Sequence, residues 1–181
     1  MLLHITRLFT LIVAFVCISS ATFAISLGEL QNSSQFWRER HDGSSDIYLD
    51  LNSVQNVIYE PPKYTLKFKV YTVDKKENFI AEGEAVADYD YNKSIEGIIK
   101  RHNLSKVPYT SEKVKSTVKK AKLKDSGVVN SLKFSAIYDL NGNVIYSGDS
   151  IAAFKKEKVD ATSSGYIISV KAFKQYYRVN F

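Results

Sequence analysis

A strict alternation of apolar and polar residues in the middle of the chain constrains the fold more than any other feature. Residues 64–70 carry a large apolar side chain at every second position, with lysine or threonine between. After a polar turn at 74–78, the alternation returns over residues 79–91. The acidic residues on the polar side of this second run are Glu82, Glu84, Asp88 and Asp90. Because successive side chains of a strand point to opposite faces, the two runs predict an antiparallel pair with one solvated face.

Shorter runs extend this sheet. Residues 36–40 and 46–51 flank the turn sequence His-Asp-Gly-Ser-Ser and predict two short strands. Residues 54–59 predict another strand, which ends at Pro61 and Pro62 because proline has no amide hydrogen to donate to a ladder. Later in the chain, Asn141-Gly142 lies between two alternating runs and predicts a hairpin with a type I′ turn, since both central residues of that turn need positive φ.

Two short helices are predicted between the strand runs. Asn92 is the expected N-cap of the first, in which Ile95, Ile98, Ile99 and His102 have helical spacing. The second, capped by Thr110 or Ser111, has only a narrow apolar stripe and should lie loosely on the surface. That stripe consists of Val114, Val118 and Ala121.

The C-terminal segment predicts a third helix, beginning near Ser163 or Ser164. Its aromatic face consists of Tyr166, Val170, Phe173 and Tyr177. The β-branched residues of this segment leave a strand as the alternative. Taken together, these elements predict an α+β fold, with an antiparallel sheet of about five to seven strands and a C-terminal helix. One or two short helices should pack on one face, and residues 25–181 should form a single domain with a lysine-rich helical insertion near 105–125.

Residues 1–24 have the three-part layout of a secretory signal peptide. Arg7 precedes the apolar run 8–18, and small residues follow up to Ala24. Cleavage is predicted after Ala24, with Ala21 as the second choice and a retained N-terminal anchor as the alternative. Cys17 follows Val16, where lipidation requires a small residue, so Cys17 is interpreted as an ordinary apolar residue of the signal. The sequence therefore predicts export to the periplasm, the cell surface or the medium.

Positive charge is concentrated in one stretch. Between Lys100 and Lys124 there are nine lysine and arginine residues and one acidic residue, Glu112, in a chain with a formal net charge of +6. In an exported protein, this stretch favours an anionic envelope component, such as a lipid headgroup or glycan, or an acidic protein as a partner, and not nucleic acid. The predicted contact surface consists of Lys113, Lys115, Lys119, Lys120, Lys122 and Lys124. A solvated helix face without a partner is the alternative.

No catalytic or metal-binding motif is present in the sequence. His41 and His102 lack neighbouring groups that form a catalytic set, although a His41–Asp50–Ser arrangement in space stays open. Asp139, Asn141 and Asn143 have the spacing of the first calcium ligands, but Val144 replaces the required glycine, so a hairpin turn is the better interpretation. The acidic row of the second strand is interpreted as a solvated face and not as a cation site. We therefore expect neither enzymatic activity nor a cofactor.

Short motifs in the chain resemble those of a bacterial family. These motifs are Phe36-Trp37, residues 47–54 (Ile-Tyr-Leu-Asp-Leu-Asn-Ser-Val), residues 136–147 around Tyr138-Asp139, and the Ser-Ser-Gly segment 163–165. In outline the chain is similar to small exported proteins related to surface-adhesin protein E. The resemblance implies a compact α+β envelope protein without enzymatic activity. This chain lacks the cysteines common in that family and has the lysine-rich segment 105–125, so no binding residue is transferred.

The leading hypothesis is an exported cell-envelope protein that acts as a non-catalytic binding or structural module, adhesin-like in character. The alternative is a periplasmic small-ligand-binding domain, with a pocket lined by tyrosines and Phe173 between the sheet and the C-terminal helix. An enzyme is the third hypothesis, and it requires His41 or His102 to lie in a cleft with other reactive groups.

Overall fold

The computed structural model describes residues 25–40 and 43–181. The predicted signal peptide, Cys17 and His41 therefore lie outside the described residues. The strands are β1 (Phe36–Arg40), β2 (Ser45–Asp50), β3 (Gln55–Glu60), β4 (Lys63–Asp74), β5 (Phe79–Asp90), β6 (Val128–Asp139) and β7 (Val144–Lys158). The helices are α2 (Leu27–Asn32), α3 (Ile95–Arg101), α4 (Glu112–Lys124) and α5 (Ser164–Tyr177), with 3-10 turns η1 (Leu51–Ser53) and η2 (Tyr91–Lys93).

The strands form one antiparallel sheet of seven strands, in the order β1-β2-β4-β5-β6-β7, with β3 paired to β4 beside this path. The predicted α+β fold with five to seven strands and a C-terminal helix is confirmed. The first part of β4, residues 63–67, pairs with β3, and its last part, residues 70–74, pairs with β2. β3 ends before Pro61 and Pro62, as the sequence predicted, and the two prolines form the turn that leads into β4.

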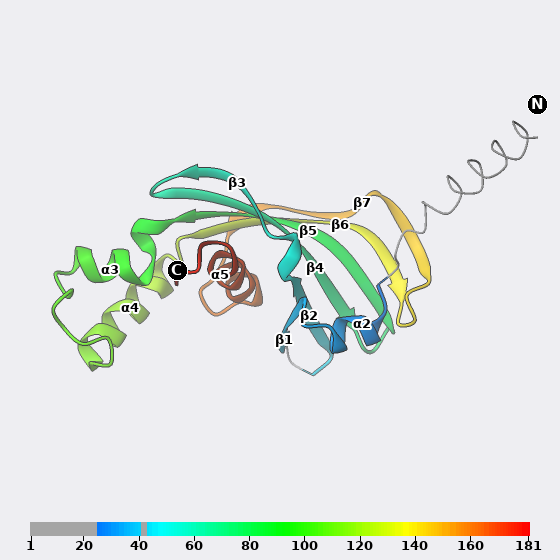
Figure 1. Ribbon diagram of the computed structural model, residues 1–181, viewed down its shortest axis with the longest axis horizontal. Helices are drawn as coiled ribbons and strands as arrows, with labels where there is room; N and C mark the ends of the chain where they lie inside the picture. The colour runs from blue at the N-terminus through cyan, green and yellow to red at the C-terminus, as the bar shows by residue number, and fades with distance from the viewer. Residues whose placement is uncertain (1–24, 41–42) are drawn as a thin grey trace, which may run out of the picture.

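The sheet buries opposite faces at its two ends. Leu66, Phe68 and Val70 alternate along β4 and lie in a core beneath α5, as predicted. Further along the same strand, the other side is buried, since Tyr71 and Val73 pack with Leu30 of α2. Figure 1 shows α5 on one side of β1 and β2 and α2 on the other. Because successive side chains of a strand point to opposite faces, each helix covers a different set of side chains of the same sheet.

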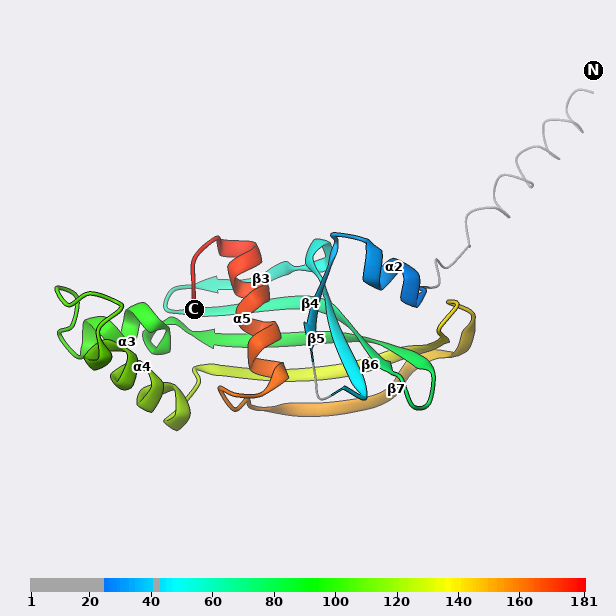
Figure 2. The ribbon, with the colours of Figure 1, turned by 90° about the horizontal axis from the view of Figure 1, so that it is seen from below.

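The C-terminal helix crosses the sheet over β4 and β5 (Figure 2). Ser163 caps it by accepting a hydrogen bond from the amide of Tyr166. The predicted aromatic face is confirmed, because Phe173 is buried in the first core and Tyr166, Val170 and Tyr177 pack against that core. The alternative of a strand in this segment was wrong.

The hairpin at Asn141-Gly142 is present, but its turn is not type I′. Gly142 has a φ of 92°, whereas Asn141 does not have positive φ. The amide of Gly142 donates to the carbonyl of Asp139, and the amide of Asp139 donates to the carbonyl of Asn143. This is a longer loop with one left-handed residue. The carboxylate of Asp139 favours it, since Oδ1 accepts the amides of Asn141 and Asn143 at 2.9 Å and 2.8 Å.

Helices α3 and α4 project from one end of the sheet (Figure 1) and form a small core of their own. We call residues 94–125 the α3–α4 unit. Its core consists of Ile99, Leu104 and Val114, with Ile95, Val107 and Val118 packed against them. Ser111 is the N-cap of α4, one of the two predicted residues. The cap of α3 is Ser94 and not Asn92, because residues 91–93 form η2 first.

Candidate anion-binding site

The predicted surface lysines lie on α4, and the helix divides them between two sides. Each residue advances the helix by about 100°, so Lys113, Lys120 and Lys124 form one row and Lys115 and Lys119 another. The row with Val114 and Val118, which packs against α3, lies between them. All five lysines are exposed. The sequence predicted one contact surface for these lysines, whereas in the structure they lie on two separate surfaces of α4.

Lys122, the sixth predicted residue, is not part of either surface. It is only 7% exposed, and its Nζ donates a hydrogen bond to the carbonyl of Ser126 at 3.0 Å. The ammonium also lies 4.2 Å from the ring centroid of Phe181 and 5.3 Å from that of Tyr166. Burial lowers the pKa of Lys122 to about 8, although nearby Asp125 acts in the opposite direction. The prediction for Lys122 was wrong because tertiary packing covers the side of α4 on which it lies.

A cleft of about 620 Å³ opens between α3 and α4. Its apolar lining comes from Ile98, which is buried, and Ala121. Its positively charged residues are Lys93, Arg101, Lys120 and Lys124, and His102 and Thr117 also line it. The sequence identified Lys120 and Lys124 as contact residues but missed Lys93, Arg101 and His102. Helical spacing could have indicated Arg101, because it follows Ile98 by three residues and lies on the same side of α3.

The cleft holds more positive charge than its neighbours neutralise. Lys93 is paired with Asp125 at 2.7 Å, an ion pair that raises the pKa of Lys93 and lowers that of the Asp125 carboxyl. Arg101 donates one hydrogen bond, from Nη2 to the carbonyl of Asn92 at 3.0 Å. Within the described part of the chain, Arg101, Lys120 and Lys124 have no carboxylate at ion-pair distance. Three cations with free donors therefore surround an apolar hollow.

Two other lysines of the α3–α4 unit do have carboxylate partners. Lys100 is paired with Glu96 at 3.1 Å, and Lys115 is paired with Glu112 at 3.0 Å. Each pair joins residues three or four positions apart on the exposed face of its own helix. Such a pair contributes only about 0.3–0.5 kcal/mol to the free energy of unfolding. Lys106, Lys113 and Lys119 also lack a carboxylate at ion-pair distance among the described residues, but only Arg101, Lys120 and Lys124 of the unpaired cations in the described part of this unit line the cleft.

The acidic row of β5 is neutralised by lysines of β4 and β7, and only Glu84 of the row is exposed, so the face is less solvated than the sequence predicted. Glu82 is paired with Lys69 at 2.8 Å and Glu84 with Lys67 at 3.1 Å. Asp90 is paired with Lys63 at 2.8 Å, and Asp88 is paired with Lys156. Among the residues that the structure describes, no group of three or more histidine, cysteine, aspartate and glutamate side chains could hold a metal ion.

The tyrosines and Phe173 do not surround a hollow, because their rings pack against each other. The ring of Phe173 lies 5.5 Å from that of Tyr64, 4.9 Å from Tyr89 and 5.2 Å from Phe181. The hydroxyl of Tyr89 donates to the carbonyl of Ser169 at 2.8 Å, which fixes this cluster to α5. A hollow of about 270 Å³ does lie beside α5, but neither a tyrosine nor Phe173 is among the residues that line it. The lining residues include Ile47, Phe68, Val70, Leu132 and Ile168.

The structure also locates the groups considered for catalysis. His102 is exposed at the cleft, and none of the described carboxylates, Asp125 of the cleft included, forms an ion pair with it. The carboxylate of Asp50 accepts hydrogen bonds from the amide of Asn52 and the side chain of Gln35. These contacts hold η1 and the chain before β1 in place. Asp50 therefore has a local structural role.

The fold and this site define an α+β domain with a cationic cleft on a projecting pair of helices. No family model, no curated protein and no solved structure matches the chain. Within residues 25–40 and 43–181, no helix has both the length and the apolar character needed to cross a bilayer.

Proposed function

We propose that this protein is an exported, non-catalytic binding or structural module of the bacterial cell envelope, and that the α3–α4 unit binds an anionic envelope component. The observation that carries the proposal is the set of cations around the cleft without ion-pair partners among the described residues, in contrast to Lys67 and Lys69 of the sheet. A cation whose charge no neighbouring group neutralises is free to interact with an external anion.

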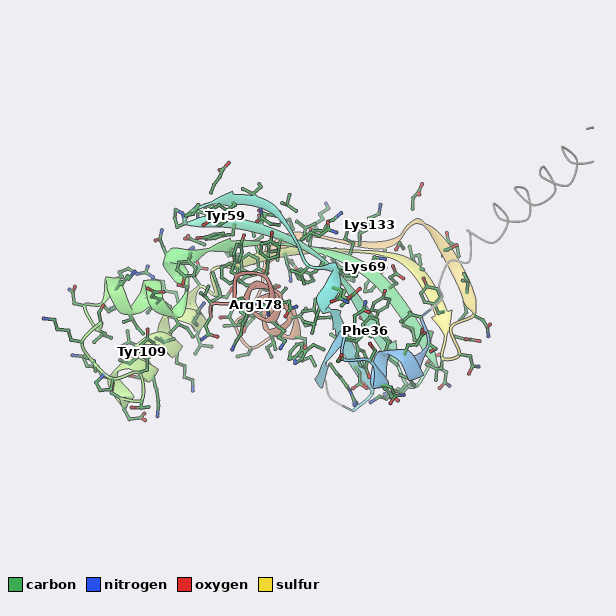
Figure 3. All side chains as sticks on the ribbon, viewed as in Figure 1. Phe36, Tyr59, Lys69, Tyr109, Lys133 and Arg178 are labelled. Atoms are coloured by element: carbon green, nitrogen blue, oxygen red, sulfur yellow. The ribbon has the colours of Figure 1, made fainter. Side chains whose placement is uncertain are left out.

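Two sequence features support the location. Residues 1–24 have the layout of a signal peptide, and the outline of the chain resembles exported proteins related to surface-adhesin protein E. The position of the site supports the same proposal, since the α3–α4 unit projects away from the two cores. Figure 3 shows Tyr109, which is 63% exposed, in this unit at the end of the molecule remote from α2. A partner can therefore approach the unit without displacing the sheet.

Binding to anionic vesicles at increasing salt tests the proposal. Each lysine that reaches an anionic membrane surface contributes about 1 kcal/mol, so loss of five lysines should weaken binding at least about 100-fold, even if only three reach the surface. The variant replaces the five exposed lysines of α4 with glutamine: Lys113, Lys115, Lys119, Lys120 and Lys124. Binding of the natural chain should also decrease steeply with salt.

A matched control removes five lysines from the sheet instead: Lys63, Lys67, Lys69, Lys156 and Lys158. Both variants have the same net charge, but the lysines of the control have carboxylate partners in the folded protein. The control should therefore bind much more tightly than the α4 variant. Equal binding by both variants would show that net charge alone attracts the protein, and would refute the assignment to the α3–α4 unit.

A further inference from the structure

The cleft between α3 and α4 combines charge with shape in a way that an exposed row of lysines does not. We propose that it binds a phosphomonoester on an organic body, with Arg101, Lys120 and Lys124 around the phosphate and Ala121 against the body. This inference rests on the proposed function, because it names the ligand of the same surface.

The charge of the cleft favours a phosphomonoester over other anions. Lys93, Arg101, Lys120 and Lys124 contribute four positive charges and Asp125 one negative charge. Lys93 and Asp125 neutralise each other through their ion pair, so three cations remain. A phosphomonoester carries about 1.5 to 2 negative charges at pH 7 and three strong acceptor oxygens. A carboxylate or a phosphodiester has one negative charge and would leave more of the cleft's charge uncompensated.

The donor geometry fits the same group. Among the described residues, Arg101 uses only one of its five N–H donors, in the hydrogen bond to Asn92. Its remaining donors include a planar pair that matches two oxygens of a phosphate. Lys120 and Lys124 are one helical turn apart on α4, so both ammonium groups can approach from the opposite side of the cleft. The phosphate would thus be bound between two helices.

The size and lining of the cleft indicate that the ligand is more than a phosphate ion. A volume of about 620 Å³ falls within the roughly 300–1,000 Å³ typical of sites for organic ligands. Ala121, which is half-buried, presents apolar surface to the body of the ligand, and Ile98, which is only 1% exposed, closes the floor of the cleft behind it. The hydroxyl of Thr117 donates to the carbonyl of Lys113 at 2.7 Å, which leaves its oxygen free to accept a hydrogen bond from the ligand. A sugar phosphate and the headgroup of a phosphorylated lipid share these properties.

Calorimetric titration of the purified protein with glucose 6-phosphate tests the inference. We expect saturable binding at one site, and weaker binding of inorganic phosphate, which lacks the organic body. The double variant Arg101→Gln, Lys120→Gln should bind glucose 6-phosphate about 100-fold more weakly, since each lost charge-assisted contact costs about a factor of ten. The matched control Lys106→Gln, Lys119→Gln also loses two unpaired exposed cations, but neither lines the cleft. It should retain affinity within about twofold.

Vesicles separate the two sources of the phosphomonoester. Phosphatidic acid presents a phosphomonoester and phosphatidylglycerol a phosphodiester. Preferential binding to phosphatidic acid at equal surface charge, with displacement by glucose 6-phosphate, would identify a lipid headgroup and support the inference. Binding of glucose 6-phosphate without any lipid preference would also support it and identify a soluble ligand.

Three results would overturn the inference. The first is equal weakening in the Arg101–Lys120 variant and its control. The second is inorganic phosphate binding as tightly as glucose 6-phosphate. The third is absence of glucose 6-phosphate binding while the natural chain still binds anionic vesicles in a salt-dependent way. The first and third results leave the α3–α4 unit as an anion-binding surface, so failure of the cleft assignment is distinguishable from failure of the proposed function.

Discussion

Replacement of Lys122 by methionine isolates the free energy of burying one charge between α4 and the aromatic core. The lysine is only 7% exposed, and burial lowers its pKa from 10.5 to about 8. In the unfolded chain the ammonium keeps its proton up to about pH 10.5, whereas the folded protein releases it near pH 8. Between these values the unfolded state binds more protons, so the free energy of unfolding rises as pH rises.

The magnitude follows from the two pKa values. Linkage gives an increase in the free energy of unfolding of about 2 kcal/mol between about pH 7 and about pH 9.5. At neutral pH the charged lysine destabilises the fold by about 3 kcal/mol relative to a neutral side chain. Attraction between the ammonium and the ring of Phe181, 4.2 Å away, favours the charged form and makes both figures upper values. Methionine has a similar length and no charge, but it loses the hydrogen bond to the Ser126 carbonyl, which costs about 1 kcal/mol.

We therefore expect Lys122→Met to raise the free energy of unfolding at pH 7 by about 2 kcal/mol, the roughly 3 kcal/mol gained less the roughly 1 kcal/mol lost. Chemical denaturation of both proteins at several pH values provides the measurement. As pH rises from about 7 to about 9.5, the free energy of unfolding of the natural protein should increase by about 2 kcal/mol more than that of the variant. Buried tyrosines such as Tyr166, whose pKa is raised to about 12, act in the opposite direction at higher pH. They are present in both proteins and cancel in the difference.

Parallel pH curves for the two proteins would refute the reasoning, because they would show that the ammonium of Lys122 is as well solvated in the folded state as in the unfolded chain. Lys119→Met provides the matched control, since it removes the charge of an exposed lysine from the same helix. It should change the free energy of unfolding by no more than about 0.5 kcal/mol at any pH.

Three further substitutions test the packing. Gly97→Ala should lower the free energy of unfolding, measured by chemical denaturation, by about 1–3 kcal/mol or more, because the Cβ of the new alanine would lie 2.5 Å from the carbonyl oxygen of Asn92. Unchanged stability would disprove this contact. Phe173→Ala should lower the free energy of unfolding by about 3–5 kcal/mol in the same assay, since Phe173 is 1% exposed. A loss below about 1 kcal/mol would contradict its central place in the core. Lys69→Gln should lower the free energy of unfolding by less than about 1 kcal/mol, and this effect should disappear at high salt. A larger loss that does not depend on salt would show that the ion pair of Lys69 with Glu82 is not a surface pair.

The main elements of the fold were predictable because their signals are local. Alternation over residues 64–91 indicated the two long strands, and the spacing of Tyr166, Phe173 and Tyr177 indicated α5. Helix α2 was not predicted, since it has six residues and only one turn of apolar spacing. The turn type at Asn141-Gly142 was wrong because the dipeptide preference did not include the carboxylate of Asp139, which favours a longer loop.

The candidate site was only partly predictable. A count of charges along the chain indicated the lysine-rich segment, and two of its lysines, Lys120 and Lys124, line the cleft. Arg101 reaches the same cleft from another helix, and Lys93 reaches it from η2. A charge count also gives no information on which lysines have partners. Lys115 has Glu112 beside it, whereas Lys120 has no carboxylate at ion-pair distance among the described residues.

The sequence by itself determined the strands and the helices α3, α4 and α5, because side-chain direction repeats every two residues in a strand and every 3.6 in a helix. Only the tertiary structure decided which face of the sheet is covered at each end, since α5 and α2 pack against opposite faces. It also decided that Lys122 is buried against Phe181 while Lys120 borders a cleft with Arg101. These contacts join residues distant in sequence, and no local period encodes them.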